Sequence, residues 1–490
     1  MNLSLLIIIP LLTAAGVLCC REFKQVRSVS LLGSVVQLGM SLFLLLQYSM
    51  QLNRSQEMMF QFSYSWFKPL SINYHVGVDG ISIAMIMLTA CVVLAGVLIS
   101  WTTEKLGKEY FFLLMLLSIG AYGFFISLDL FTLFFFLEIA VIPKFLLIGI
   151  WGSGKKEYSA MKLALMLMAG SALVFVGLAG LYVNTHTFDI LKIAQLSIPV
   201  QTQKIFFPFA FVGFGVFTAL FPFHTWVPDG HSSAPTAASM FLAGISMKLG
   251  GYGCLRVATY LMPDAAHAYS GIIILLATIA IIYGAFATMM QTDLKYINAY
   301  SSVSHCGFVL LGIGMLTKTS INGAVMQMVS HGLMTALFFA TIGMIYSRTH
   351  TRLVAQLGGL LKVTPFISTV FVIAGLCSLG LPGLSGFAAE ITVFMGSWQN
   401  ADKWYRMATI LACASIVVTA VYILQATGKT IMGPLNNNYQ VLNDAKWNER
   451  IAAGILIIGI VVIGVAPFLI NQLIGSGTDE IMTRVLGVAK

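Results

Sequence analysis

The sequence predicts an all-α, polytopic membrane protein of about fourteen transmembrane helices in one domain, residues 1–490. Hydrophobic residues make up 58% of the chain and charged residues 9%, too few charges to cover a soluble protein of this length. Apolar runs recur from one end to the other, and each is long enough to cross a hydrocarbon core of roughly 30 Å. No linker separates them, so we expect a single transmembrane domain without a soluble module.

Each expected span is an apolar run bounded by polar residues or turn formers. The shortest connection, Ser127–Asp129, joins the fourth and fifth spans. The expected limits are near residues 3–20, 29–50, 80–101, 110–127, 130–151, 159–184, 205–227, 233–258, 268–290, 296–316, 320–346, 366–398, 405–432 and 451–474.

The basic residues predict the orientation of the chain. Of the 27 Lys and Arg residues, fifteen lie in loops after odd-numbered spans and ten in the remaining loops and termini. Because cytoplasmic loops carry the excess of positive charge, we expect both termini outside the cytoplasm, in a cell inner membrane. The net charge of +9 is spread thinly, which is not the pattern of a nucleic-acid-binding surface.

Two of the expected spans are interrupted by proline and glycine. Residues 220–230 of the seventh span include Pro222 and Pro228, and residues 379–386 of the twelfth include Pro382. Proline removes a backbone donor, and in lipid such a break survives only inside a bundle or beside water. Paired broken helices are typical of transporters with inverted repeats; ordinary proline kinks are the alternative.

Two acidic residues lie within expected spans. Glu138 has eight uncharged residues before it and five after it, and a charge at mid-membrane costs about 2.5–3.5 kcal/mol. It must therefore face the bundle, be paired, or be protonated part of the time, as a proton carrier is. Glu390 follows the interruption of the twelfth span as its counterpart. A glutamate that only bonds across helices is the alternative.

Basic residues within the spans add further candidates. Lys248 is flanked by uncharged residues; burial disfavours its charged form and a nearby carboxylate favours it, so it could take up and release a proton. His305 and His331 are expected to carry protons or to bond between helices. His224, next to a Pro-Phe pair, is expected to be structural.

No motif for a redox cofactor or a nucleotide is present in the sequence. It contains no GxGxxG turn, no phosphate-binding loop and no cluster of metal ligands. The seven cysteines form no CxxC pair and are expected to be packing residues. We therefore expect no cofactor in this chain, and any redox chemistry linked to it must occur in other proteins.

Several motifs together resemble the antiporter-like membrane subunits of complex I, the NADH:quinone oxidoreductase, and among them the chain M group (NADH dehydrogenase subunit 4). The resemblance covers roughly residues 75–435. The motifs that carry it are Phe221–His231, Ala234–Thr236, Lys248–Gly253, Gln291–Lys295 and Tyr300–His305.

The resemblance implies two inverted five-helix repeats, near residues 110–258 and 268–432, with broken seventh and twelfth helices. It also implies half-channels joined by a polar axis in the middle of the membrane. The residues expected to carry protons are Glu138, Lys162, Lys248, His305, His331 and Glu390. Possible supporting residues are Asp129, Lys144, His224 and Lys295, although Asp129 and Lys295, near span ends, could simply anchor their helices.

The expected function is a non-redox, proton-translocating subunit of an NADH:quinone oxidoreductase. NADH, flavin, iron–sulfur clusters and quinone are expected in other subunits, and the expected partners are membrane-arm neighbours of the chain L and chain N types and the lipid bilayer. A sodium/proton antiporter subunit and the equivalent subunit of a membrane-bound hydrogenase remain alternatives. A haem protein is disfavoured, because His305 and His331 fall in different spans without a partner at haem spacing.

One position departs from the family pattern. Seven residues before His224 the family usually has a lysine that partners the glutamate of the fifth span, and here this position is Phe217. We expect Lys162 to supply the missing charge within about 4–6 Å of Glu138, the range in which an opposite charge favours ionisation. Lys144 is the second candidate, although on a straight helix it would point about 240° away from Glu138.

Overall fold

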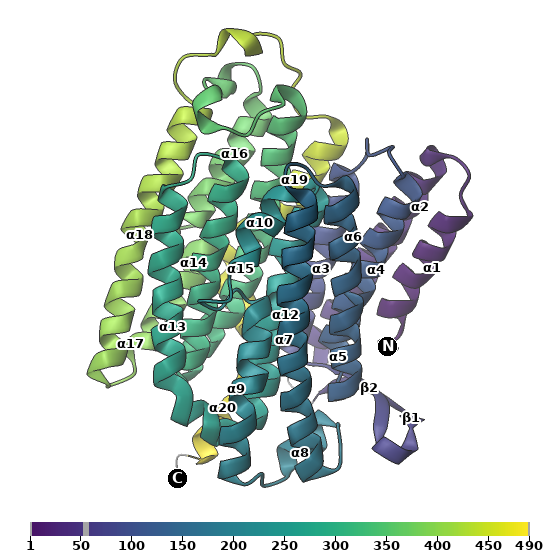
Figure 1. Cartoon of the computed structure of the whole chain (residues 1–490), viewed down its shortest axis with the longest axis vertical. Helices are drawn as coiled ribbons and strands as arrows, with labels where there is room; N and C mark the ends of the chain where they lie inside the picture. The colour runs from purple at the N-terminus through teal and green to yellow at the C-terminus, as the bar shows by residue number, and fades with distance from the viewer. Residues whose placement is uncertain (1, 52–57, 489–490) are drawn as a thin grey trace.

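The computed structural model describes residues 2–51 and 58–488, and it confirms the all-α membrane fold. Most of the helices run along one common direction and form an elongated bundle (Figure 1). Among the described residues, ten helices are long and apolar enough to cross a membrane. Arg54 and Lys490, which contributed to the predicted orientation, lie outside the described residues.

The elements follow one another as a succession of helices with one β-hairpin. In chain order they are α1 (Leu5–Cys19), α2 (Phe23–Gln51), β1 (Met59–Phe67), η1 (Lys68–Leu70), β2 (Ile72–Val78), α3 (Gly80–Ile99), α4 (Gly107–Ile126), α5 (Leu130–Ile139), α6 (Val141–Trp151), α7 (Lys156–Thr185), α8 (Ile190–Gln195), α9 (Val200–Phe217), α10 (Trp226–Ser233), α11 (Thr236–Phe241), η2 (Leu242–Ser246), α12 (Met247–Gly253), η3 (Cys254–Thr259), α13 (Pro263–Met289), α14 (Leu294–Gly314), α15 (Lys318–Thr349), η4 (Val354–Gln356), η5 (Leu360–Lys362), α16 (Pro365–Ser378), α17 (Ser385–Trp398), α18 (Lys403–Thr430), η6 (Asn437–Tyr439), α19 (Trp447–Val465) and α20 (Pro467–Val488).

The two expected interruptions are present. Helix α9 ends at Phe217 and α10 begins at Trp226, while α16 ends at Ser378 and α17 begins at Ser385. In the second break Gly380 has a φ of +75°, a conformation that residues with a side chain rarely adopt. The prolines and glycines of these segments therefore break the helices where the sequence predicted.

Two further spans are divided in ways that the sequence analysis did not anticipate. The expected fifth span is interrupted at Ala140, between α5 and α6. The expected last span, 451–474, includes Ala466, where α19 ends and α20 follows. Helix α20 then continues to Val488. Helix α20 is therefore an addition to the predicted spans. The later turns of α20 contain charged residues, so hydropathy alone did not include them.

The β-hairpin is also an addition to the prediction. Strands β1 and β2 pair antiparallel, and the Leu128 N–H, in the loop before α5, donates to the His75 carbonyl of β2 at 2.8 Å. The His75 side chain pairs with Asp189 at 3.0 Å. Burial acts to raise the pKa of Asp189, but hydrogen bonds and charge interactions with His75 and Lys192 together lower that pKa. These contacts hold the hairpin against the loops that precede α5 and α8.

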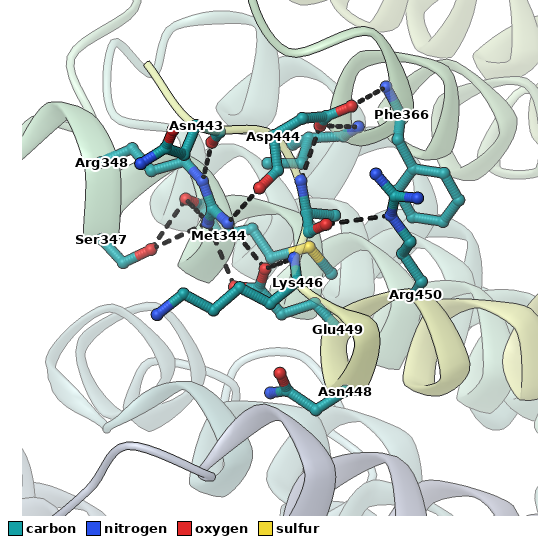
Figure 2. A network of polar contacts seen from close by, with 12 residues as sticks. Met344, Ser347, Arg348, Phe366, Asn443, Asp444, Lys446, Asn448, Glu449 and Arg450 are labelled. Atoms are coloured by element: carbon teal, nitrogen blue, oxygen red, sulfur yellow. Dashed lines mark hydrogen bonds and ion pairs between the residues drawn. The ribbon is translucent and has the colours of Figure 1, made fainter.

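A polar network joins three helix ends at the end of the bundle where α18 connects to α19. Figure 2 shows the Arg348 guanidinium of α15 facing Glu449 of α19, with nitrogen–oxygen distances of 2.6 and 3.1 Å. Asp444 accepts hydrogen bonds from the Phe366 and Ile367 N–H groups at the start of α16, at 2.8 and 3.2 Å. The network thus satisfies backbone donors that a helix N-terminus otherwise leaves free.

Helices α3, α14 and α15 form the interior of the bundle. In the most apolar window of α15, 94% of the residues are buried, whereas in α19 the share is 28%. Most polar side chains of α14 and α15 are therefore shielded from solvent and find their hydrogen-bond partners within the bundle, several of them at backbone carbonyls. The candidate residues His305 and His331 belong to this buried set.

Candidate functional site: a buried chain of proton-binding groups

Lys248 lies in α12, a short α-helical stretch between two π-helical stretches. The π-helical turns η2 and η3 flank α12, and π-turns within helices often occur at functional sites. The Lys248 amine donates to the Ala243 carbonyl of η2 at 2.5 Å and faces Nδ1 of His331, on α15, at 2.7 Å. The side chain is 1% exposed, so these two acceptors hold it within the bundle.

His331 is next to Gly332, where α15 and η2 approach each other closely. A Cβ added at Gly332 would lie 2.7 Å from the Gly244 carbonyl oxygen of η2, which is closer than real Cβ atoms approach. Gly332 therefore allows α15 to approach η2 closely enough for His331 to reach Lys248. Acceptance at Nδ1 places the proton of the neutral ring on Nε2.

His305 of α14 continues the chain of polar groups. The centre of its ring lies 5.4 Å from that of His331. Its Nδ1 is 3.3 Å from both the Gln327 amide nitrogen and the Glu390 carboxylate. A bare Nδ1 accepts from the amide and a protonated Nδ1 donates to the carboxylate, so both tautomers of the ring have a bonding partner.

The break between α16 and α17 supplies two groups around His305. The last residue of α16, Ser378, faces Nε2 of His305 at 3.0 Å, and Glu390 projects from α17. A Cβ added at Gly380 would lie 2.8 Å from a Glu390 carboxylate oxygen, so the break leaves space for this side chain. The four predicted residues Lys248, His331, His305 and Glu390 consequently form one buried series.

The remaining predicted lysine, Lys162, lies in a second polar group. Its amine pairs with the Asp229 carboxylate of α10 at 2.7 Å, and the Tyr296 hydroxyl donates to Asp229 at 3.4 Å. Asp229 and Tyr296 also line a pocket open to the surface, together with Lys155 and Arg352. We expected the Lys162 amine to lie beside Glu138, but its partner in the structure is Asp229.

Glu138 is half-buried at the end of α5, with its Oε1 enclosed. Lys144, on α6, is 1% exposed, and its amine lies 5.8 Å from the centre of the Phe217 ring. Among the described residues, neither Glu138 Oε1 nor the Lys144 amine has a hydrogen-bond partner. The first half of the chain therefore places a carboxylate and an amine in its interior without satisfying either.

The other supporting candidates have structural contacts. Asp129 caps α5 through the Phe131 and Thr132 N–H groups at 3.0 and 3.1 Å. Lys295 donates to the Ala234 carbonyl, which follows the last turn of α10, at 2.6 Å. His224 packs between the rings of Phe221 and Tyr283, with centre-to-centre distances of 5.4 and 4.9 Å. These contacts account for the three side chains as anchors of helix ends and loops.

Two residues of the site were absent from the sequence candidates. Asp229 is the partner of Lys162, and His231 is fully buried between Trp226 and Phe339. Within the described part of the chain, neither ring nitrogen of His231 has a hydrogen-bond partner. Both residues belong to the motif Phe221–His231, so a search for ionisable residues within the motifs would have found them.

Comparisons with known proteins agree with this architecture. A family described as "NADH:quinone oxidoreductase/Mrp antiporter, TM" matches residues 127–418. The NADH-quinone oxidoreductase subunit M of Rickettsia bellii is 33% identical over 98% of each chain.

Solved structures share the same fold. A chain of respiratory complex I from Thermus thermophilus superposes with a TM-score of 0.88 at 23% identity, and one of the Mrp complex from Dietzia sp. with 0.85 at 17%; each match covers 99% of both chains. The family match spans more than half of the chain and includes both broken helices. The chain therefore belongs to the family of NADH:quinone oxidoreductase and Mrp antiporter transmembrane subunits.

Proposed function

We propose that this chain is a proton-translocating, non-redox subunit in the membrane arm of an NADH:quinone oxidoreductase. The observation that carries the proposal is the unbroken series Lys248, His331, His305 and Glu390, in which neighbouring groups are within bonding or ring-contact distance. NADH, flavin, iron–sulfur clusters and quinone are bound by other subunits, and chains of the L and N types flank this one in a cell inner membrane, with both termini outside the cytoplasm.

The series provides alternating proton donors and acceptors. The Lys248 ammonium gives a proton to Nδ1 of His331, which leaves a neutral amine and an imidazolium. The His331 imidazolium then releases a proton to the His305 ring, whose centre lies 5.4 Å away. The His305 imidazolium donates from Nδ1 to the Glu390 carboxylate, which leaves a neutral imidazole and a carboxylic acid. The transfers from Lys248 to His305 move one positive charge without creating a new one, and the last transfer neutralises the imidazolium and the carboxylate together, which keeps the cost of burial low.

Access from the surface involves the second polar group. The pocket lined by Asp229 and Tyr296 opens beside Lys155 and Arg352, both in loops that the charge bias assigns to the cytoplasmic side. We infer that protons pass from this pocket by way of the Lys162–Asp229 pair toward His231 and Lys248. Glu138, on α5, responds to charge changes in the neighbouring subunit, so that it couples this chain to the rest of the complex.

Sodium/proton exchange is the competing function. Sodium, like other hard cations, is bound by several oxygen ligands, whereas Lys248, His331 and His305 offer nitrogen atoms. The series therefore favours protons as the transported ion. Without NADH, a sodium gradient is expected to move no protons through vesicles that contain this complex, and sodium-driven proton movement would support the antiporter instead.

The proposed function can be tested with Lys248→Met in the whole complex, reconstituted in sealed vesicles. We expect loss of NADH-driven acidification, while NADH oxidation by a water-soluble electron acceptor continues because the electron-transfer subunits are untouched. Lys204→Met, at an exposed position of α9, is the matched control. Normal acidification by an assembled Lys248→Met complex would refute the proposal.

A further inference from the structure

Two ionisable side chains of the first half remain unexplained by the series described above. The Oε1 atom of Glu138 and the amine of Lys144 are buried, and the described residues give neither a hydrogen-bond partner. An isolated charge within a membrane protein is costly, so such groups are normally paired with one another or face a polar path. Two groups of opposite sign on consecutive helices, both unsatisfied, are natural partners.

A turn that departs from the regular α-helix lies between the two residues, at Ala140. The Ala140 N–H is shared between the Phe136 and Leu137 carbonyls, at 3.3 and 3.2 Å, which tightens the turn between α5 and α6. Pro143 has no N–H to bond the carbonyl of Ile139. The 240° separation was calculated for a straight and regular helix, and the segment from α5 to α6 is not regular.

The group next to the Lys144 amine is an aromatic ring, which can attract the charged amine but cannot take its proton. The ring of Phe217, the last residue of α9, lies 5.8 Å from the amine. An aromatic face attracts a cation, but it has no lone pair that could accept a proton. The other nearby candidate amine, that of Lys162, is already bonded to Asp229. Lys144 thus remains the amine available to Glu138.

We propose that Lys144 is the proton-exchanging partner of Glu138, held in place by the face of Phe217. A proton passes from the Glu138 carboxyl group to the Lys144 amine, directly or through water, and leaves a carboxylate and an ammonium. The reverse transfer restores two neutral groups. This inference rests on the proposed function, because it names the residue that lets Glu138 change charge at low cost during pumping.

Three variants of the whole complex separate charge from proton exchange. Lys144→Met removes the amine, and we expect NADH-driven acidification of vesicles to fall on the order of tenfold, as for loss of a proton-transfer group. Lys144→Arg keeps the positive charge but cannot be deprotonated, so it is expected to assemble and to pump as poorly. Full pumping by either assembled variant overturns the inference. Lys204→Met is the control.

A compensating variant tests the position of the charge. In Lys144→Met combined with Phe217→Lys, the new amine extends from the α9 side toward the space that the Lys144 amine occupied, and pumping is expected to recover most of what Lys144→Met loses. No recovery in an assembled double variant counts against the shared location of the two amines.

Glu138→Gln distinguishes the two proposals. If this variant pumps normally, Glu138 has no part in translocation, and the proposed role of the first half of the chain fails. If only Lys144→Met pumps normally, the pairing alone fails.

Discussion

The amine of Lys248 lies 2.7 Å from Nδ1 of His331, and this contact joins α12 to α15 inside the bundle. It depends on backbone atoms as much as on the two side chains, because Gly332 brings α15 close to the carbonyl oxygen of Gly244. The link between the two halves of the chain is therefore sensitive to changes that leave every ionisable residue in place.

Gly332→Ala is expected to break this contact. The added Cβ would lie 2.7 Å from the Gly244 oxygen, so α15 must move away and His331 with it. We expect NADH-driven proton pumping to fall about tenfold or more, while complex assembly is retained. Gly428→Ala, where an added Cβ meets no atom within 4 Å, is the control. Equal pumping in the two variants would show that the contact is dispensable.

Gln327→Leu tests the two-partner environment of His305. The amide of Gln327 is the donor to Nδ1, and Glu390 is the acceptor. Without the amide, the tautomer with a bare Nδ1 loses its partner, and the ring is held in the form that donates to Glu390. We expect a severalfold loss of pumping that Gln327→Asn partly avoids, measured by acidification of vesicles. Leu and Asn variants that pump like the unaltered protein would contradict this role.

Asp229→Asn tests the access route. The carboxylate that pairs with the Lys162 amine at 2.7 Å becomes a neutral amide, so Lys162 loses its counter-charge at the inner end of the pocket. We expect slower proton uptake at limiting proton concentration, and hence a larger loss of pumping at pH 8 than at pH 6. Glu157→Gln, in the first turn of α7, the helix that carries Lys162, serves as the control. A loss independent of pH would argue against an access role.

Arg348→Met concerns stability instead of transport. The guanidinium makes two bonds to Glu449 and further bonds to the Asn443 and Asp444 carbonyls (Figure 2). Removing it leaves a largely buried carboxylate unpaired, which is expected to cost about 2–3 kcal/mol. The measurement is thermal unfolding of the purified complex. A variant as stable as the original would show that the network contributes little.

The sequence predicted the features that depend on local chemistry. The breaks around Pro222 and Pro382 follow from proline and glycine in an apolar segment. The inward position of Lys248, His305, His331 and Glu390 follows from the cost of charge in lipid. The place of the two histidines on one polar axis is implied by the family resemblance, because a histidine within a span is equally suited to a simple bond between helices.

The misplaced or missing features depend on contacts between distant segments. Lys162 was expected near Glu138, but its partner Asp229 is 67 residues away in sequence, and no local pattern links the two. Lys144 was the second candidate, after Lys162, because a straight helix was assumed across Ala140. The β-hairpin was missed although the alternation of aromatic and polar residues in 59–67 is a strand signal, because the search was for long apolar runs.

The most direct test of proton conduction by the buried series is the number of protons translocated per NADH oxidised in vesicles that contain the Glu390→Gln complex. Gln preserves the size of the side chain but cannot take the proton offered by Nδ1 of His305, 3.3 Å away. We predict that the ratio falls in Glu390→Gln and is partly retained in Glu390→Asp. An unchanged ratio in an assembled Glu390→Gln complex would contradict the claim that protons pass along Lys248, His331, His305 and Glu390.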